Sequence, residues 1–509
     1  MFRAYDQKQA FLLPPALSDF LDASHPAHVI NDIVERLDLS RLENRYGHMG
    51  QPAYHPRLML KVILYGFTVG VFSSRKFQRA CQENLAFKYL AGMETPAFKT
   101  FIEFRRRHRE DMKAVFVQTV KLAREMGMAK LGAVALDGCK LEADTSKHKA
   151  MSYGRMQDEA KRLKAEIEAL LKTAEEADEN EDTEHGPDDD GYRLSEELAR
   201  REGRLAKIEE ARAALEERER RDNPEEPIDP KKQISFADHD ARCYSKKGDG
   251  TRYVYNAQAA VDMASQIIVE NHIEDSVQDA QAARPALDNM KQDLDTLPDK
   301  LVADAGYGNK STLTACQEHK VVPLCATMRE DKGGQASGKL DTMNYDGVRD
   351  RFECPHGQVF EFDQKRPKDG KKSYRSLGQI DCDCSYYTTR DGRGVIKALP
   401  GHFAKRELRR IMEEPSHREI YRRRKCTVEP VFGQIQVGMG FRRFLYRGRK
   451  NVGSEWNLVC AALNVKKMAA RMQKSRGWCF LTQIVDYIRL LGRLIVAVAR
   501  QDAPLPQHA

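Results

Sequence analysis

The 509-residue sequence predicts a mixed α/β protein with a helical N-terminal domain, a core of mixed strands and helices, and two insertions in that core. Apolar residues recur at helical spacing over the first quarter of the chain. Short strand-like runs then alternate with helical segments, and a long acidic stretch separates the first of these runs from the second. A mean hydropathy of −0.64 and a charged fraction of 31% indicate a soluble, polar chain.

The N-terminal part, residues 1–130, is expected to be helical. The stretch "HPRLMLKVILYGFTVGVFSSRKFQRACQENLAFKYLAG" carries apolar residues at helical spacing, and Ser73 or Ser74 is placed to cap a second helix. The following "TPAFKTFIEFRRRHREDM" predicts a basic helix. Two short helices beside a basic one fit a DNA-binding module related to the helix-turn-helix. Amphipathic helices with a solvated basic face are the alternative.

An acidic insertion is predicted over residues 155–230, which hold 14 Lys and Arg against 26 Asp and Glu. Its apolar residues step by three and four, and "EEADENEDTEHGPDDDG" interrupts them. This pattern predicts an antiparallel coiled-coil hairpin, with a plain charged spacer as the alternative. Without this insertion the rest of the chain would carry a net charge of +20 instead of +8.

The core begins with "GAVALDGCKLEA" in 131–154 and resumes over 231–326. The second part contains strands in "TRYVYNAQAAVD" and "SQIIVENHI", a helix over 279–292, a strand in "KLVADAGYG", a helix near 310–318 and a strand in "VVPLCA". A β-rich, Cys-containing insertion over 327–403, a basic helical part over 404–475 and a C-terminal helix and tail over 476–509 follow. This order is that of an RNase-H-like fold, in which the first and fourth strands are neighbours and the final helix packs against them.

Three acids occupy notable places in this order. Asp137 lies inside the first strand, Asp304 ends the fourth, and Glu429 lies on the last helical part, so the fold would bring them together. Converging carboxylates repel one another unless a cation lies among them. Oxygen ligands of this kind favour Mg²⁺ or Mn²⁺, and two such ions suit phosphoryl transfer. The alternatives are a turn cap at Asp137, an Asx-turn at Asp304 and an ordinary surface acid at Glu429.

The blocks "LDGCKLEADTS", "YNAQAAVD", "VADAGYGN" and "VEPVFGQIQVGMGFRRFLYRGRKNVGSEWNLVCAALNVKKM" resemble those of bacterial insertion-sequence DDE transposases. The N-terminal helical stretch resembles the domain that precedes their catalytic core. The resemblance implies that Asp137, Asp304 and Glu429 are a catalytic triad that holds the metal ions used to cut and rejoin DNA ends. It also implies double-stranded DNA partners, namely the terminal inverted repeats and the target, and a homodimer on DNA.

The basic segment 401–475 carries 18 Lys and Arg against 6 Asp and Glu, a balance that suggests a polyanionic partner. Many relatives place Tyr, Arg and Lys around the catalytic Glu where this chain has Arg422, Lys425 and Gln436, so the grip on the DNA end departs from the family pattern. The residues expected to contact DNA are Lys140, Arg424, Lys425, Gln436, Arg442, Arg443 and Arg447.

The eleven cysteines show no disulfide framework, so a reducing, cytoplasmic setting is expected. Relatives often carry a cysteine cluster that resembles a zinc knuckle in the β-rich insertion. The one-residue spacing within both pairs is cramped for Zn²⁺ and favours free thiols; the residues concerned are Cys354, His356, Cys382 and Cys384. The apolar stretch 478–499 is interrupted by Asp486, Arg489 and Arg493, which argues against a membrane span.

The sequence therefore predicts a metal-dependent DNA transposase. Two alternatives remain open at this point: a nuclease that shares the core but lacks strand transfer, and a domesticated DNA-binding protein without catalysis.

Overall fold

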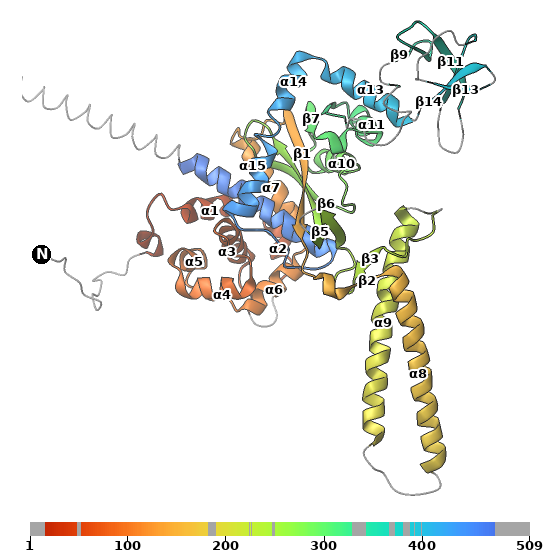
Figure 1. Ribbon diagram of the computed structural model, residues 1–509. Helices are drawn as coiled ribbons and strands as arrows, with labels where there is room; N and C mark the ends of the chain where they lie inside the picture. The colour runs from red at the N-terminus through yellow and green to blue at the C-terminus, as the bar shows by residue number, and fades with distance from the viewer. Residues whose placement is uncertain are drawn as a thin grey trace, which may run out of the picture. The chain divides into compact units, whose positions relative to one another are not determined.

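The computed structural model describes residues 16–47, 52–181, 190–222, 224, 226–246, 250–327, 340, 343–365, 372–379, 387–390, 392–398 and 400–473. The chain forms two compact units, one of Met1–Met128 with Asn457–Ala509 and one of Ala129–Trp456 (Figure 1). None of the described helices is long and apolar enough to cross a membrane. The C-terminal helix expected over 476–509 lies outside the described residues.

The first unit is helical, as predicted. Its central helix, α3, buries residues on nearly every side, and Pro56 at its first position follows His55, whose Nδ1 accepts a hydrogen bond from the backbone of Arg57. Ser73 caps α4 by accepting from the backbone N–H of Lys76, which confirms the predicted helix start. The helices are α1 (Pro26–Glu35), α2 (Ser40–Glu43), α3 (Pro56–Thr68), α4 (Ser74–Glu83), α5 (Leu85–Leu90), α6 (Phe98–Arg107) and α7 (Met112–Glu125).

The arginines of α6 are used differently from what a basic DNA-facing helix would require. Arg105 is buried and donates to the carbonyl of Phe72 and to the hydroxyl of Ser74, so it joins α6 to the start of α4. Arg106 is exposed but pairs with Glu103 on its own helix. Part of the positive charge on α6 is therefore already used within the unit.

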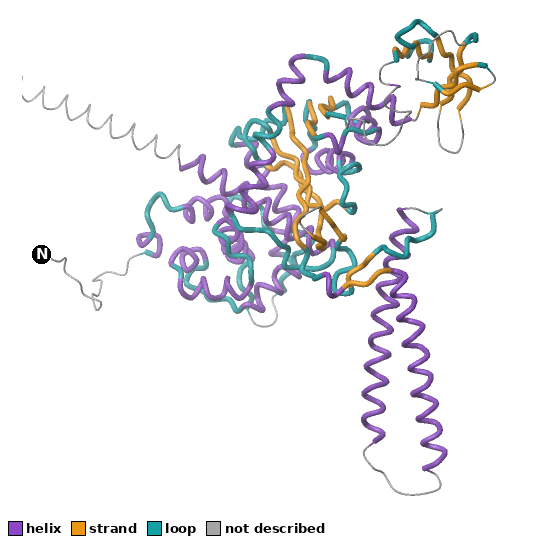
Figure 2. Tube along the Cα trace, viewed as in Figure 1, coloured by secondary structure: helices purple, strands orange, loops and turns teal. Residues whose placement is uncertain are grey.

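The second unit contains the predicted RNase-H-like sheet (Figure 2). Its central strand β1 pairs antiparallel with β5 on one side and parallel with β7 on the other, and β8 continues the sheet beyond β7. β4 and β6 pair with successive parts of β5. The strands are β1 (Ala133–Glu142), β4 (Arg242–Lys246), β5 (Gly250–Asp262), β6 (Ile268–Glu274), β7 (Lys300–Ala303) and β8 (Val322–Cys325).

Helices contact this sheet at its edges and centre: α10 contacts β6, α11 and α13 contact β8, and α15 contacts β1. The last described helix, 449–473, begins in the second unit and ends in the first. The helices are α10 (Ala283–Leu294), α11 (Lys310–Glu318), α13 (Pro400–Met412), α14 (Pro415–Arg422) and α15 (Val428–Gly433), which a π-helical turn over Gln434–Gly438 extends.

The acidic insertion is the expected helical hairpin, with α8 (Tyr153–Glu181) and α9 (Asp190–Asp222) running antiparallel (Figure 2). The short strands β2 (Ala150–Ser152) and β3 (Gln233–Ser235) pair at its base. The buried seam near the base includes Ile234 of β3, so the hairpin shares its apolar contacts with residues outside it. The helix residues of this seam are Met156, Ala160, Leu163, Ile208, Ala211 and Leu215.

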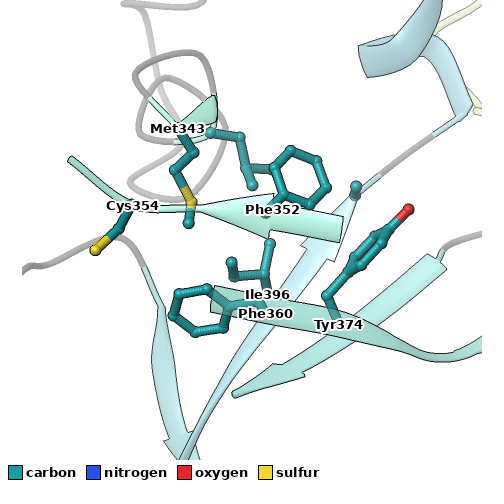
Figure 3. Close-up of a cluster of buried hydrophobic side chains, with 8 residues drawn as sticks. Met343, Phe352, Cys354, Phe360, Tyr374 and Ile396 are labelled. Atoms are coloured by element: carbon teal, nitrogen blue, oxygen red, sulfur yellow. The ribbon is translucent and has the colours of Figure 1, made fainter. Parts of the chain in front are cut away.

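The β-rich insertion is a separate six-stranded antiparallel sheet with its own small apolar core. Figure 3 shows Phe352, Phe360 and Tyr374 packed around Ile396. The strands are β9 (Asn344–Asp346), β10 (Arg351–Glu353), β11 (Val359–Lys365), β12 (Lys372–Ser376), β13 (Thr388–Arg390) and β14 (Arg393–Ala398).

Candidate active site

The register of the parallel strands β1 and β7 brings Asp137 and Asp304 together. Leu136 of β1 lies opposite Ala303 of β7, and the next residue after each of them is one of the two acids. Neighbouring strands lie about 4.8 Å apart, which puts both carboxyl groups at one place on the sheet. The prediction that these two strands are neighbours is confirmed.

Each of these carboxylates is oriented by a nearby backbone N–H. Asp137 Oδ1 accepts from Gly138 N at 2.8 Å, and Asp304 Oδ1 accepts from Gly306 N at 2.8 Å. Asp304 thereby caps the short 3₁₀ turn Ala305–Tyr307. The Asx-turn considered as an alternative for Asp304 is present, and it fixes the carboxylate beside Asp137.

Glu429 is linked to Asp137 through the side chain of Arg424. Glu429 lies in the first turn of α15, where Pro430 is tolerated because a helix start leaves N–H groups unpaired in any case. Arg424 Nη1 donates to Asp137 Oδ2 at 3.0 Å, and Arg424 Nη2 lies 3.8 Å from Glu429 Oε1. A single guanidinium thus joins the acid of β1 to the acid of α15.

The site carries more negative than positive charge. Burial raises the pKa of Asp137 to about 6, and the charges of Asp304 and Asp279 act in the same direction, while Gly138 N–H and Arg424 oppose them. A folded-state pKa above the usual value means that ionising Asp137 near neutral pH costs folding free energy. A bound cation would remove that cost.

A fourth acid, Asp279, was not predicted. Its Oδ1 accepts from Lys140 Nζ at 2.8 Å, from Asn256 Nδ2 at 2.9 Å and from Gln258 Nε2 at 2.7 Å. Tyr307 donates to Gln258 Oε1, which closes the network. Asn256 and Gln258 could have been found as polar residues at alternate positions of the otherwise apolar "YNAQAAVD", whereas Asp279 lies in a loop without any local pattern.

These contacts change what two of the expected DNA-contacting residues do in this structure. The ammonium of Lys140 is paired with Asp279 and also donates to Asn256 Oδ1 at 3.1 Å. Arg424 is buried against Asp137, with 9% of its side chain exposed. Both cations therefore neutralise acids of the site.

The other expected DNA-contacting residues follow the chain beyond α15. Gln436, on the π-helical turn, donates to the Sγ of Cys139 at 2.6 Å, and Cys139 lies two residues after Asp137. Arg443 pairs with Glu142 at 3.0 Å and Arg447 with Asp144 at 2.9 Å, both through exposed groups. Glu142 also bonds to this segment through its backbone, so the segment runs along the end of β1. Lys425 and Arg442 are exposed.

Of the four residues considered as Zn²⁺ ligands, the structure describes Cys354 and His356, and their environments differ. Cys354 is 3% exposed within the apolar cluster of the β-rich insertion (Figure 3), and its Sγ accepts from Gln358 N at 3.3 Å. His356 is exposed. A thiol packed in an apolar core behaves as a small apolar side chain. Cys382 and Cys384 lie outside the described residues.

The donor set at the sheet suits a hard divalent cation, because Asp137, Asp304 and Glu429 offer only carboxylate oxygens. As they are arranged here, the described His, Cys, Asp and Glu side chains include no group of three that could hold a metal ion. The guanidinium of Arg424 lies between Asp137 and Glu429 instead.

An RNase-H-like sheet with carboxylates gathered at its first and fourth strands defines a class of enzymes that transfer phosphoryl groups of nucleic acids. Two family models match the chain: a transposase domain (DUF772) over residues 15–107 and a transposase DDE domain over residues 224–465. The chain belongs to the DDE transposases and is a DNA transposase. Comparison with curated proteins and with solved structures found no match.

The second match contains Asp304 and Glu429, whereas Asp137 lies outside both matched ranges. Membership in this family implies DNA as the substrate and a divalent metal ion as the cofactor.

Proposed function

We propose that Asp137, Asp304 and Glu429 are the catalytic acids of this transposase and hold two Mg²⁺ or Mn²⁺ ions. The enzyme would cut DNA at the terminal inverted repeats of its element and join the ends to target DNA, as a homodimer on DNA in the bacterial cytoplasm, at the nucleoid. The observation that carries this proposal is the β1–β7 register, which sets Asp137 and Asp304 side by side. The link from Asp137 through Arg424 to Glu429 supports the third assignment.

Asp137, Asp304 and Glu429 would hold the divalent ions, whose chemistry when bound would be to activate a water or a 3′-hydroxyl and to stabilise the leaving oxygen. The chain's own contribution is orientation. The N–H groups of Gly138 and Gly306 each hold one carboxylate oxygen of the two aspartates, so the remaining oxygens need not reorganise when ligands bind.

The experiment that tests this function follows both chemical steps on one substrate. A labelled duplex carrying an end of the element is incubated with the protein and a target plasmid, with Mg²⁺ or with EDTA. We expect strand cleavage and joined products in Mg²⁺ and neither in EDTA. Cleavage without joining would identify a nuclease, and binding without cleavage would identify a non-catalytic DNA-binding protein; either result contradicts the proposal. The mass of the protein–DNA complex checks the dimer.

Changing Arg442 and Arg443 together to Ala should weaken the salt dependence of DNA binding. Exposed ion pairs such as Arg443–Glu142 contribute little to stability, so Arg443 can exchange a carboxylate for a phosphate. Arg442 is exposed and donates to the backbone carbonyl of Gln436. Each phosphate contact contributes about 0.9 to the slope of log K against log salt, so the slope should fall by roughly 1.8 on duplex DNA. Binding titrations at several salt concentrations measure this slope.

A matched control replaces Arg162 and Arg204 with Ala. These two are exposed and ion-paired, as Arg443 is, but they lie in the acidic hairpin and share Glu159. The control should keep the wild-type slope. If the Arg442 and Arg443 variant keeps that slope and loses thermal stability instead, these arginines are internal salt-bridge residues and the DNA path lies elsewhere.

A further inference from the structure

The guanidinium of Arg424 occupies an unusual place for a residue of a DNA-binding enzyme. It is held between two acids, with Nη1 3.0 Å from Asp137 Oδ2 and Nη2 3.8 Å from Glu429 Oε1. Its side chain is 9% exposed, whereas that of Glu429 is 55% exposed. A buried guanidinium is costly to keep unless carboxylates surround it, so this position follows from the charge of the site.

The backbone fixes Arg424 to the same turn that carries Glu429. The carbonyl oxygen of Arg424 accepts hydrogen bonds from Thr427 N at 2.9 Å and from Val428 N at 3.1 Å, where α15 begins. The ion pair with Asp137 therefore ties the start of α15 to β1. In the absence of another cation, this side-chain bond helps to keep Glu429 beside the sheet.

A divalent cation held by the acids would compete with this arrangement. It would need oxygens of Asp137 and Glu429, and the guanidinium already contacts Asp137 Oδ2 and faces Glu429 Oε1. Two cations within a few ångströms in a partly buried site repel each other strongly. The guanidinium and a metal ion therefore cannot both be held at these oxygens at full strength.

We propose that Arg424 is a positioning residue that stands in for the metal charge: it holds Asp137 and Glu429 together in the metal-free enzyme and withdraws when a divalent cation binds. This inference rests on the proposed function, since it takes these acids as metal ligands. Because the two cations exclude each other, removing the guanidinium should strengthen metal binding and weaken the metal-free fold.

The test measures Ca²⁺ binding to the full chain without DNA, by calorimetry and by the melting temperature in EDTA and in rising Ca²⁺. Arg424→Gln should bind Ca²⁺ roughly tenfold more tightly than wild type, within the usual range of coupling between ligands. It should also melt lower than wild type in EDTA and approach the wild-type melting temperature at saturating Ca²⁺. A purely structural salt bridge would lower the melting temperature equally in both conditions.

The matched control is Arg423→Gln, which removes the same charge one residue away at an exposed position. It should leave Ca²⁺ affinity unchanged. Arg424→Lys covers the case in which the Gln variant does not fold. A single ammonium can pair with only one of the two acids, so this variant should gain Ca²⁺ affinity by a smaller factor.

Unchanged or weaker Ca²⁺ affinity in the Arg424 variants would overturn the inference. Asp304→Asn, measured in the same way, separates this failure from failure of the proposed function. If Asp304→Asn loses Ca²⁺ binding while the Arg424 variants show no gain, the acids bind metal and only the role of Arg424 is wrong. If Asp304→Asn binds Ca²⁺ as wild type does, the metal-binding assignment itself fails, and the role given to Arg424 fails with it.

Discussion

Asp304→Asn is expected to reduce Mg²⁺-dependent strand cleavage by roughly 10³-fold or more, which corresponds to about 4 kcal/mol of lost transition-state stabilisation. The amide keeps the shape of the side chain. Its oxygen can still accept the hydrogen bond that Gly306 N donates to Asp304 Oδ1 in the wild-type protein. What it loses is the negative charge that a hard cation requires. Cleavage is measured on a labelled element end, and DNA affinity is measured on the same duplex.

DNA binding should survive in this variant, because the basic segment after α15 is unchanged. Asp295→Asn is the control. Asp295 directly follows α10 shortly before β7, its side chain is 93% exposed, and Asn tolerates its left-handed backbone, with a φ of 51°. It should cleave as wild type does. Normal cleavage by Asp304→Asn would remove Asp304 from the catalytic site.

Gly138→Ala should destabilise the second unit and impair cleavage, although alanine is a small residue. A methyl group at position 138 would lie 2.2 Å from Gln258 Nε2, 2.6 Å from Asp279 Oδ1 and 2.7 Å from Asn256 Oδ1. These three side chains hold one another in place, so none can move without breaking hydrogen bonds around Asp279. Overpacking of this kind costs about 1–3 kcal/mol.

Thermal denaturation should therefore show a melting temperature several degrees below wild type, with loss of cleavage at temperatures where the variant is still folded. Gly132→Ala, just before the same strand, is the matched control. The nearest atom to its added methyl group is Asp299 Oδ2 at 3.9 Å, an ordinary contact. A Gly138→Ala variant as stable and active as Gly132→Ala would mean that the network around Asp279 adapts freely and does not constrain the site.

The amino-acid sequence by itself determined the order of the elements and the positions of the three acids along them. The spacing of apolar residues along the chain predicts strands and helices. β1 and β7 were expected to be neighbours because the order of the elements matches that of an RNase-H-like sheet. The cap at Ser73 and the apolar spacing along each helix of the hairpin are equally local, because each depends on residues within one or two helical turns.

Only the tertiary structure decided which charges meet. Arg424 and Asp137 are 287 residues apart in sequence, and Lys140 and Asp279 are 139 apart, yet each pair is in direct contact. Arg105 likewise reads as one of several similar arginines until its burial beside Ser74 is seen. Spacing along the chain predicts the face of a strand or helix, whereas the partner of a long, flexible cation is selected by charge and burial among segments that folding brings together.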